Sequence, residues 1–231
     1  QISQKTIQIA GTLESIDKAG RKSEKAYQLS KASSELKRDM EKILLSNQAA
    51  VTGDASTARK LGSLQAWVET NYVGAGTAGA DGTTARVSGT DAAFTETMLK
   101  NAVKSAYEQG GNPSVLMVTP TQKQVVSGFA GIAEQRYQAP SNAPTTIVGA
   151  ADVYLSDFGT LSVVPNRFMS ADADDDGEVA FVLDPEYASI AYLRPFATNE
   201  LAKTGDSEKT QLLVEYTLEV KNEKAHAIIA D

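Results

Sequence analysis

Residues 20–51 read GRKSEKAYQLSKASSELKRDMEKILLSNQAAV, and this stretch decides the fold. After Gly20 it contains neither proline nor glycine, and charged residues recur on most turns of an α-helix. The stretch predicts one helix over about 21–50, which at about 1.5 Å per residue would be roughly 45 Å long. A compact chain of this length has a radius of gyration of about 17 Å, so the helix would run from one side of the molecule to the other.

The apolar residues of this helix form one narrow stripe. They are spaced by three or four positions, as one face of a helix requires: Leu29, Ala32, Leu36, Met40, Ile43 and Leu44. Charged residues cover the other faces, and Lys31 with Glu35 and Lys37 with Glu41 are spaced for ion pairs along the helix. The stripe is too narrow for a central core helix and too irregular for a coiled coil. We therefore expect a helix that rests on a sheet with one face.

Composition excludes several classes of protein. The chain has 231 residues, 42% of them hydrophobic, which is an ordinary globular value and enough for a sizeable core. Its net charge of −7 argues against a surface that binds nucleic acid or an anionic membrane. There is no cysteine, so disulfides, cysteine-ligated zinc and cysteine nucleophiles are excluded. No apolar run approaches the length of about 18 residues that spans a bilayer.

The rest of the chain mixes strands and helices. Alternation at Ile7 and Ile9 predicts a strand that begins abruptly, as if its partner lay upstream. A segment rich in Gly, Ala and Thr, residues 71–90, reads as a loop. A helix capped by Thr90 or Asp91 should follow, with Phe94, Met98, Ala102 and Tyr107 on one side.

The second half of the chain is rich in predicted strands. A short buried strand in residues 112–120 should lead into a helix capped by Thr119 with Pro120 at its first position. A hairpin should turn at residues 157–159, and two more strands should be separated by Asp184 and Pro185. Long strands in which apolar and polar residues alternate are predicted in the last part of the sequence. The order of these elements predicts an α+β fold.

Two motifs suggest ligand binding, and neither is complete. Gly74, Gly76 and Gly79 spell G-x-G-x-x-G, which in a dinucleotide site opens a helix, but the residues that follow do not predict one. The run from Asp172 to Asp176 matches the first half of a calcium loop, which requires a carboxylate at its twelfth position; that position is Leu183. A nucleotide-binding enzyme and a calcium-binding module therefore remain as alternative functions.

Motifs for catalysis are weaker still. Ser34 and Lys37 spell S-x-x-K and residues 203–205 spell K-T-G, as in penicillin-recognising enzymes, but Ser34 lies in mid-helix among charges. The D-F-G at residues 157–159 has no accompanying kinase motif. The one histidine, His226, lies in a predicted strand and suits a structural role. We therefore expect no catalytic, cofactor-binding or metal-binding residues, no cofactor and no enzyme activity.

The most specific signal is spread along the whole chain, from about Lys5 to the end. Four segments resemble, in order, the major head (capsid) proteins of tailed bacteriophages, which have the HK97-like capsid fold: KTIQIAGTLESIDKAGRKSEKAYQLSKASSELKRDMEKILLSNQ, TARKLGSLQAWVETN, AAFTETMLKNAVKSAYEQGGNPSVLMVTP and VLDPEYASIAYLRPFATNELAKTGDSEKTQLLVEYTLEVKNEKAHAIIAD. In this family a long spine helix lies across a sheet in a peripheral domain, and an axial domain is inserted in the chain.

The resemblance implies a division of the chain. Residues 1–11 would be the remnant of an extended loop, and 12–92 the first part of the peripheral domain, with the spine helix at about 21–50. Residues 93–183 would form the axial domain, and 184–231 would return to the peripheral domain and pack along the spine. Several tens of further residues would precede Gln1, and we expect them to be cleaved, omitted or disordered.

The resemblance also implies a function. The chain would be a structural subunit that assembles with itself into hexamers and pentamers, forming an icosahedral or prolate shell around the viral DNA. Portal protein, and scaffold or decoration proteins, would be its other partners; contact with packaged DNA would be non-specific, and no membrane is involved. The protein would belong to the virion and assemble in the host bacterial cytoplasm.

Overall fold

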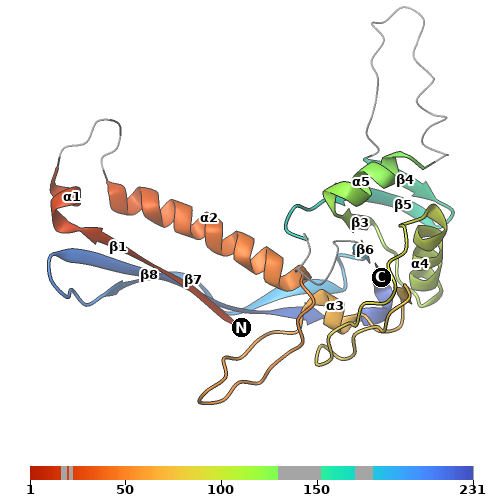
Figure 1. Cartoon of the computed structure of the whole chain (residues 1–231), viewed down its shortest axis with the longest axis horizontal. Coiled ribbons are helices and arrows are strands. Elements are labelled where there is room, and N and C mark those ends of the chain that lie inside the picture. Colours follow the sequence, from red (N-terminus) through yellow and green to blue (C-terminus); the bar gives the residue numbers. More distant parts are fainter. Residues whose placement is uncertain (17–19, 21–22, 130–151, 170–178, 231) are drawn as a thin grey trace, which may run out of the picture.

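The structure is a computed structural model that describes residues 1–16, 20, 23–129, 152–169 and 179–230. Figure 1 shows a long arm joined to a wider body. The helices are α1 (Gly11–Ser15), α2 (Glu24–Leu45), α3 (Leu64–Trp67), α4 (Glu96–Glu108), α5 (Pro120–Ser127) and the 3-10 helix η1 (Glu223–Ala225). The strands are β1 (Ile2–Ala10), β2 (Tyr72–Val73), β3 (Val115–Val118), β4 (Val153–Ser156), β5 (Gly159–Pro165), β6 (Ala180–Leu183), β7 (Ala188–Leu201), β8 (Ser207–Val220) and β9 (Ala227–Ile229).

The arm is α2 lying along a three-stranded antiparallel sheet, in the order β1-β8-β7 (Figure 1). The apolar stripe is confirmed as the buried face of α2: Ala32, Leu36, Met40 and Leu44 are all buried. Leu36, Met40 and Leu44 form one core with Leu212, Val214 and Tyr216 of β8. Alternate residues of β8 therefore face α2, and the residues between them face the other side of the sheet.

An upstream partner for β1 stays a prediction, because β1 is an edge strand of its sheet. Within the described chain, the strand also has a partner that the sequence did not predict. Its register runs from Ile2 opposite Glu215 to Ala10 opposite Ser207, so its partner in the described part of the chain is β8, far downstream. Alternation along a strand identifies the buried face, but says nothing about which distant segment completes the sheet.

The spine helix is shorter than expected at its C-terminal end. It ends at Leu45, because the next residues bond to other parts of the chain: Asn47 Nδ2 donates to the Arg86 carbonyl at 2.7 Å, and the Gln48 backbone N–H donates to Ser63 Oγ at 3.0 Å. At the other end, Ser23 accepts a hydrogen bond from the Ala26 N–H and caps the helix.

The expected ion pairs within α2 are replaced by contacts with other elements. Glu35 pairs with Lys5 of β1 instead of Lys31. Lys37 lies 5.9 Å from the ring centroid of Phe196 on β7, and Glu41 accepts a hydrogen bond from Asn166 at 2.7 Å. The flanks of the helix therefore contact β1, β7 and the segment that follows β5, in addition to the contact of its apolar face with the sheet.

The body is built on a six-stranded mixed sheet with the order β2-β9-β6-β3-β5-β4. Helices α4 and α5 cover one face, where Leu99, Leu116 and Val126 share a core. The other face packs on α3 and the end of α2, where Phe181 and Ile228 meet Leu45. Alternate residues of each central strand therefore pack in the two cores on opposite faces of the sheet. The second of these cores joins the body to the arm.

Several predicted boundaries are confirmed in the body. Thr119 caps α5 in a complete capping box with Gln122, and Pro120 is the first helical residue. The hairpin of β4 and β5 and the break at Asp184 and Pro185 are also present. The predicted start of α4 was wrong, because Thr95, and not Thr90 or Asp91, is its cap. Tyr107 is exposed, because position 107 lies on the face of the helix opposite Met98.

The C-terminal strands divide between the two sheets. β7 and β8 lie along the spine as expected, whereas the last strand, β9, joins the body sheet between β2 and β6. The aspartate run from Asp172 to Asp176 lies outside the described residues. No helix in the described ranges is both long and apolar enough to cross a membrane.

Candidate assembly surface

The glycine-rich motif is used for close packing of the backbone. A Cβ atom on Gly74 would lie 1.6 Å from the carbonyl oxygen of Ala230, and one on Gly79 would lie 2.4 Å from that of Gln65. The space that a phosphate would occupy in a dinucleotide site is filled here by the chain's own backbone, and no described helix begins at these glycines.

The other motif residues do not converge on a site. Ser34 donates to the Ser30 carbonyl of its own helix at 3.1 Å, whereas Lys203 lies in the turn between β7 and β8 and pairs with Glu208 at 3.3 Å. Phe158 of the D-F-G stacks on Tyr107, with ring centroids 4.9 Å apart. Within the described ranges, no cluster of three His, Cys, Asp or Glu residues could hold a metal ion.

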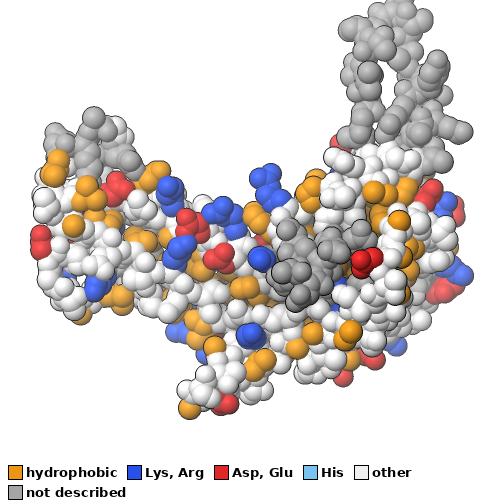
Figure 2. Space-filling view, in the orientation of Figure 1, with side chains coloured by type: hydrophobic (Ala, Val, Ile, Leu, Met, Phe, Trp, Pro, Cys, Tyr) orange, Lys and Arg blue, Asp and Glu red, His pale blue; other side chains and the backbone are white. Residues whose placement is uncertain are grey.

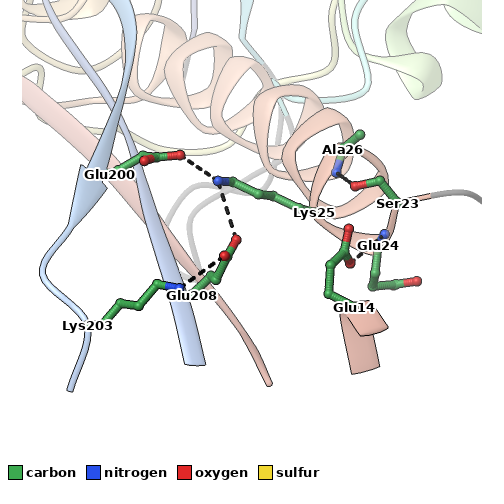
Figure 3. A network of polar contacts seen from close by, with 8 residues as sticks. All are labelled: Glu14, Ser23, Glu24, Lys25, Ala26, Glu200, Lys203 and Glu208. Atoms are coloured by element: carbon green, nitrogen blue, oxygen red, sulfur yellow. Dashed lines mark hydrogen bonds and ion pairs between the residues drawn. The ribbon is translucent and has the colours of Figure 1, made fainter. Parts of the chain in front are cut away.

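A network of ion pairs closes the tip of the arm (Figure 3). Lys25 Nζ, in the first turn of α2, lies 2.7 Å from Glu200 Oε1 and 3.7 Å from Glu208 Oε2. Lys203 Nζ lies 3.3 Å from the other oxygen of Glu208. Glu14 of α1 accepts the Glu24 N–H at 3.1 Å, so the start of α2 is tied to α1 and to both strands of the β7–β8 hairpin.

The tip network fixes geometry more than it adds stability. The hydrogen bond between Lys25 and Glu200 raises the pKa of Lys25 and lowers the pKa of Glu200. Glu200 is 81% exposed, however, and exposed pairs of this kind contribute little to stability because water competes for both partners. The network instead holds α1, α2, β7 and β8 in one arrangement at the end of the arm.

A second charged cluster lies on the sheet face opposite α2. Glu215, in the middle of β8, is 6% exposed, and its two carboxylate oxygens lie 2.6 Å from Arg194 Nε and 2.8 Å from an Arg59 guanidinium nitrogen. The hydrogen bond from Arg194 is the main cause that lowers the pKa of Glu215. Arg59 belongs to the loop after α2, so its ion pair with Glu215 holds that loop against β8.

Replacing Glu215 with glutamine should destabilise the chain above about pH 4.5, the carboxyl's ordinary pKa, and progressively less below it. The lowered pKa means that the ionised pair stabilises the fold fully above that value, and the stabilisation is lost as the pH falls through the folded-state pKa. Urea denaturation across this range measures the difference, with the exposed Glu219→Gln on the same strand as the matched control. A difference that does not change with pH would contradict the assignment.

Large apolar side chains are exposed along the outline of the molecule. Figure 2 shows hydrophobic patches at the end of the arm and on the body. The most exposed include Leu13 and Ile16 at the tip, Leu193 on β7 and Leu155 on β4, at 45%, 56%, 77% and 77%. β7 and β4 are edge strands of their sheets. Unpaired edges and exposed apolar groups are typical of surfaces that contact another protein.

This surface was missing from the sequence analysis. In β7 and β4, apolar residues alternate or run together just as they do in buried strands, so the pattern cannot separate a core residue from a contact residue. Only the order of strands in each sheet identifies β4 and β7 as edges. Tyr192 and Leu193 are adjacent apolar residues that are both exposed, but adjacent apolar residues are also both buried in β6, so the pair gave no usable signal.

Solved structures from the class of shell-forming proteins share the fold of this extended subunit. The capsid asymmetric unit of cyanophage A-1(L) matches 100% of this chain and 77% of its own, with a TM-score of 0.68 at 12% identity. The SrpI encapsulin complex of Synechococcus elongatus matches 100% and 73%, with a TM-score of 0.61 at 10% identity. The fold is thus the HK97-like fold of phage capsids and encapsulins.

The family model of the SU10 major capsid protein matches residues 1–231, so the chain belongs to that family. The major capsid protein of Escherichia phage Phieco32 is 26% identical over 268 aligned residues, covering 99% of this chain and 74% of that protein. The resemblance seen in the sequence is therefore confirmed. The chain is a structural subunit of a phage head and a component of the virion, not an enzyme.

Proposed function

We propose that copies of this chain form hexamers and pentamers that close into an icosahedral or prolate shell around the viral DNA, assembled in the host bacterial cytoplasm. The observation that supports this most is the arm: one 22-residue helix fastened along a sheet, with exposed apolar groups at its end. Such a subunit meets its neighbours through different surfaces, and contacts of that kind close into rings and shells when the rotation permits.

We further propose the division of the subunit that the family resemblance implies. Residues 12–92 and 184–231 would make the peripheral domain around α2, residues 93–183 the axial domain, and residues 1–11 the remnant of an extended loop. The two sheets support two units, although β2 and β9 join the axial strands from outside 93–183. Portal protein, and scaffold or decoration proteins, complete the proposed partners, while DNA is held only non-specifically.

Electron microscopy of the purified major capsid protein tests the proposal of a shell. Particles of uniform diameter, built from rings of six and five copies, are the expected result. Each contact can be weak, because many simultaneous contacts give a large avidity. A protein that stays monomeric at every concentration and salt condition tried would refute it.

The tip of the arm should be one of the contacts between copies. The double variant Leu13→Lys, Ile16→Lys places charges on the two exposed apolar residues without touching the core. We expect on the order of tenfold fewer particles, or more, because about 1.4 kcal/mol lost per contact already weakens it tenfold. The matched control is Ser34→Lys, at an exposed position on α2. An unchanged particle yield with the tip variant would exclude this contact.

A further inference from the structure

The side of α2 that faces away from the sheet is basic, although the chain as a whole carries a net charge of −7. Lys31, Arg38 and Lys42 are exposed and lie opposite the buried stripe, because they are spaced by seven and four residues along the helix. Lys37 is exposed beside Arg38, and Figure 2 shows Lys and Arg side chains along α2 between the tip and the body. These four residues and Arg167, in the segment after β5, form what we call the basic face.

The carboxylates of α2 offset this positive charge only in part. Glu35 pairs with Lys5 of β1, and Glu41 accepts a hydrogen bond from the Asn166 amide at 2.7 Å, so both are engaged by other elements. Among the α2 carboxylates, all of which lie in the described ranges, only Asp39 is exposed. Exposed cations therefore outnumber exposed carboxylates on this helix, and the net charge of the whole chain hides a local excess of positive charge.

The basic face includes a hollow where α2 meets the segment after β5. This hollow of about 370 Å³ is lined by Lys37, Arg38 and Arg167, together with Glu41. Neither arginine forms an ion pair with any residue that the structure describes. A guanidinium group presents its donors as a planar fork that fits two oxygens of one phosphate. Two arginines and a lysine around one hollow therefore suit a phosphate group.

The composition of the basic face fits a polyanion better than the surface of another protein. The centre of a protein–protein interface is rich in apolar groups and poor in charged ones. The described residues of α2 include an exposed aromatic ring at Tyr27, but no exposed large apolar side chain between positions 30 and 42. The row from Lys31 to Lys42 is about 16 Å long, and a DNA strand places a phosphate about every 3.4 Å along its axis. Such a row can contact several phosphates at once.

We infer, on the basis of the shell proposed above, that the basic face contacts the phosphates of the enclosed double-stranded DNA and that the α2 side of the arm faces the interior of the head. DNA inside a shell touches only the inward side of each subunit, so the contact surface also defines the orientation of the subunit. Contacts from Lys and Arg to phosphates carry no sequence information, which suits a container for a whole genome.

Binding of a short fluorescent DNA duplex to unassembled subunits tests the contact. The variant Lys37→Gln, Arg38→Gln, Arg167→Gln removes the three cations at the hollow. Its control makes the same change of charge at three exposed lysines elsewhere: Lys60→Gln, Lys221→Gln and Lys224→Gln. Fluorescence anisotropy at about 50 mM salt should show binding weakened on the order of tenfold by the first variant and less than about twofold by the control.

The salt dependence of binding gives a second readout from the same samples. Each phosphate contact adds about 0.9 to the slope of log affinity against log salt concentration. The slope should therefore fall by about 2–3 in the variant of the basic face and stay unchanged in the control. A loss of affinity through misfolding would not be confined to one of two variants with equal charge, and circular dichroism checks that both are folded.

Streptavidin binding to assembled particles tests the orientation. The chain has no cysteine, so a biotin can be attached at Ser34→Cys, between Lys31 and Arg38 on α2, or at Thr217→Cys. Thr217 is exposed and lies on the other side of the sheet, because its neighbour Tyr216 packs against α2. Streptavidin added to intact particles should bind the label at 217, and should bind the label at 34 only after the particles are opened.

The outcomes separate this contact from the shell itself, because anisotropy is measured on unassembled subunits. Equal loss of affinity in the two triple variants, or no binding by the native subunit at about 50 mM salt, would overturn the DNA contact. A variant of the basic face that binds DNA normally but forms fewer particles would show that the face contacts another copy, which also overturns it. Streptavidin bound to the label at 34 on intact particles would overturn the orientation.

Discussion

Leu36→Ala should lower the free energy of unfolding by about 2–5 kcal/mol, the cost of a cavity in a close-packed core. Leu36 is 2% exposed and lies in the middle of the face that α2 presents to the sheet. Its neighbours in that core are Leu212, Val214 and Tyr216, all on the central strand. These neighbours cannot collapse into the space, because β8 is held by β1 on one side and β7 on the other.

Denaturation in guanidinium chloride measures the effect, and Ser34→Ala is the matched control. Ser34 lies two residues earlier on the exposed side of α2, and its hydroxyl donates to the Ser30 carbonyl of the same helix. We expect this control to change stability by a few tenths of a kcal/mol at most. Equal effects of the two substitutions would mean that α2 is not seated on the sheet, and the interpretation of the arm as a rigid unit would fail.

Asn71→Asp should be as damaging as the loss of a core residue, although it changes one nitrogen to oxygen. Asn71 is 1% exposed, and its Nδ2 donates to the carbonyls of Lys224 and His226 at 2.7 and 2.9 Å. An aspartate would leave both carbonyls without their donor and place a negative charge against them. At about 1–3 kcal/mol for each buried group left unsatisfied, we expect a loss of roughly 2–6 kcal/mol.

The same denaturation experiment with Asn101→Asp isolates the effect of position. Asn101 is exposed on α4, so the identical chemical change should have almost no effect there. We also expect Asn71→Asp to recover part of its stability in mild acid, because a protonated carboxyl can donate one of the two lost hydrogen bonds. Equal stabilities of the two variants at neutral pH would show that Asn71 does not hold the end of the chain in place.

Local signals predicted the elements whose causes are local. The stripe of α2, the cap at Thr119 and the break at Asp184 and Pro185 each depend on a few neighbouring residues. Two predictions failed because groups distant in the sequence decide the outcome. The end of α2 depends on Arg86 and Ser63, and the place of β9 depends on β2 and β6, which no window of sequence around them contains.

The candidate assembly surface was less predictable than the fold. The glycines at 74–79 suggested a ligand, but close approach of the backbone to Ala230 explains Gly74. Glu215 looked like any charged strand residue, because its partners Arg59 and Arg194 reach it from other segments. Residues that contact another copy are harder still to predict from the sequence, because the surface they pack against belongs to another molecule.

The pairing of β1 with β8 also constrains how the chain is made. About 200 residues separate the paired positions, and at about 5–20 residues per second a ribosome needs roughly 10–40 s to synthesise them. Throughout that interval the first strand has emerged without the strand that completes its sheet. Contacts this distant in sequence form late, so the arm can be finished only after β8 has been translated. Chains that terminate before β8 therefore lack the central strand of the arm.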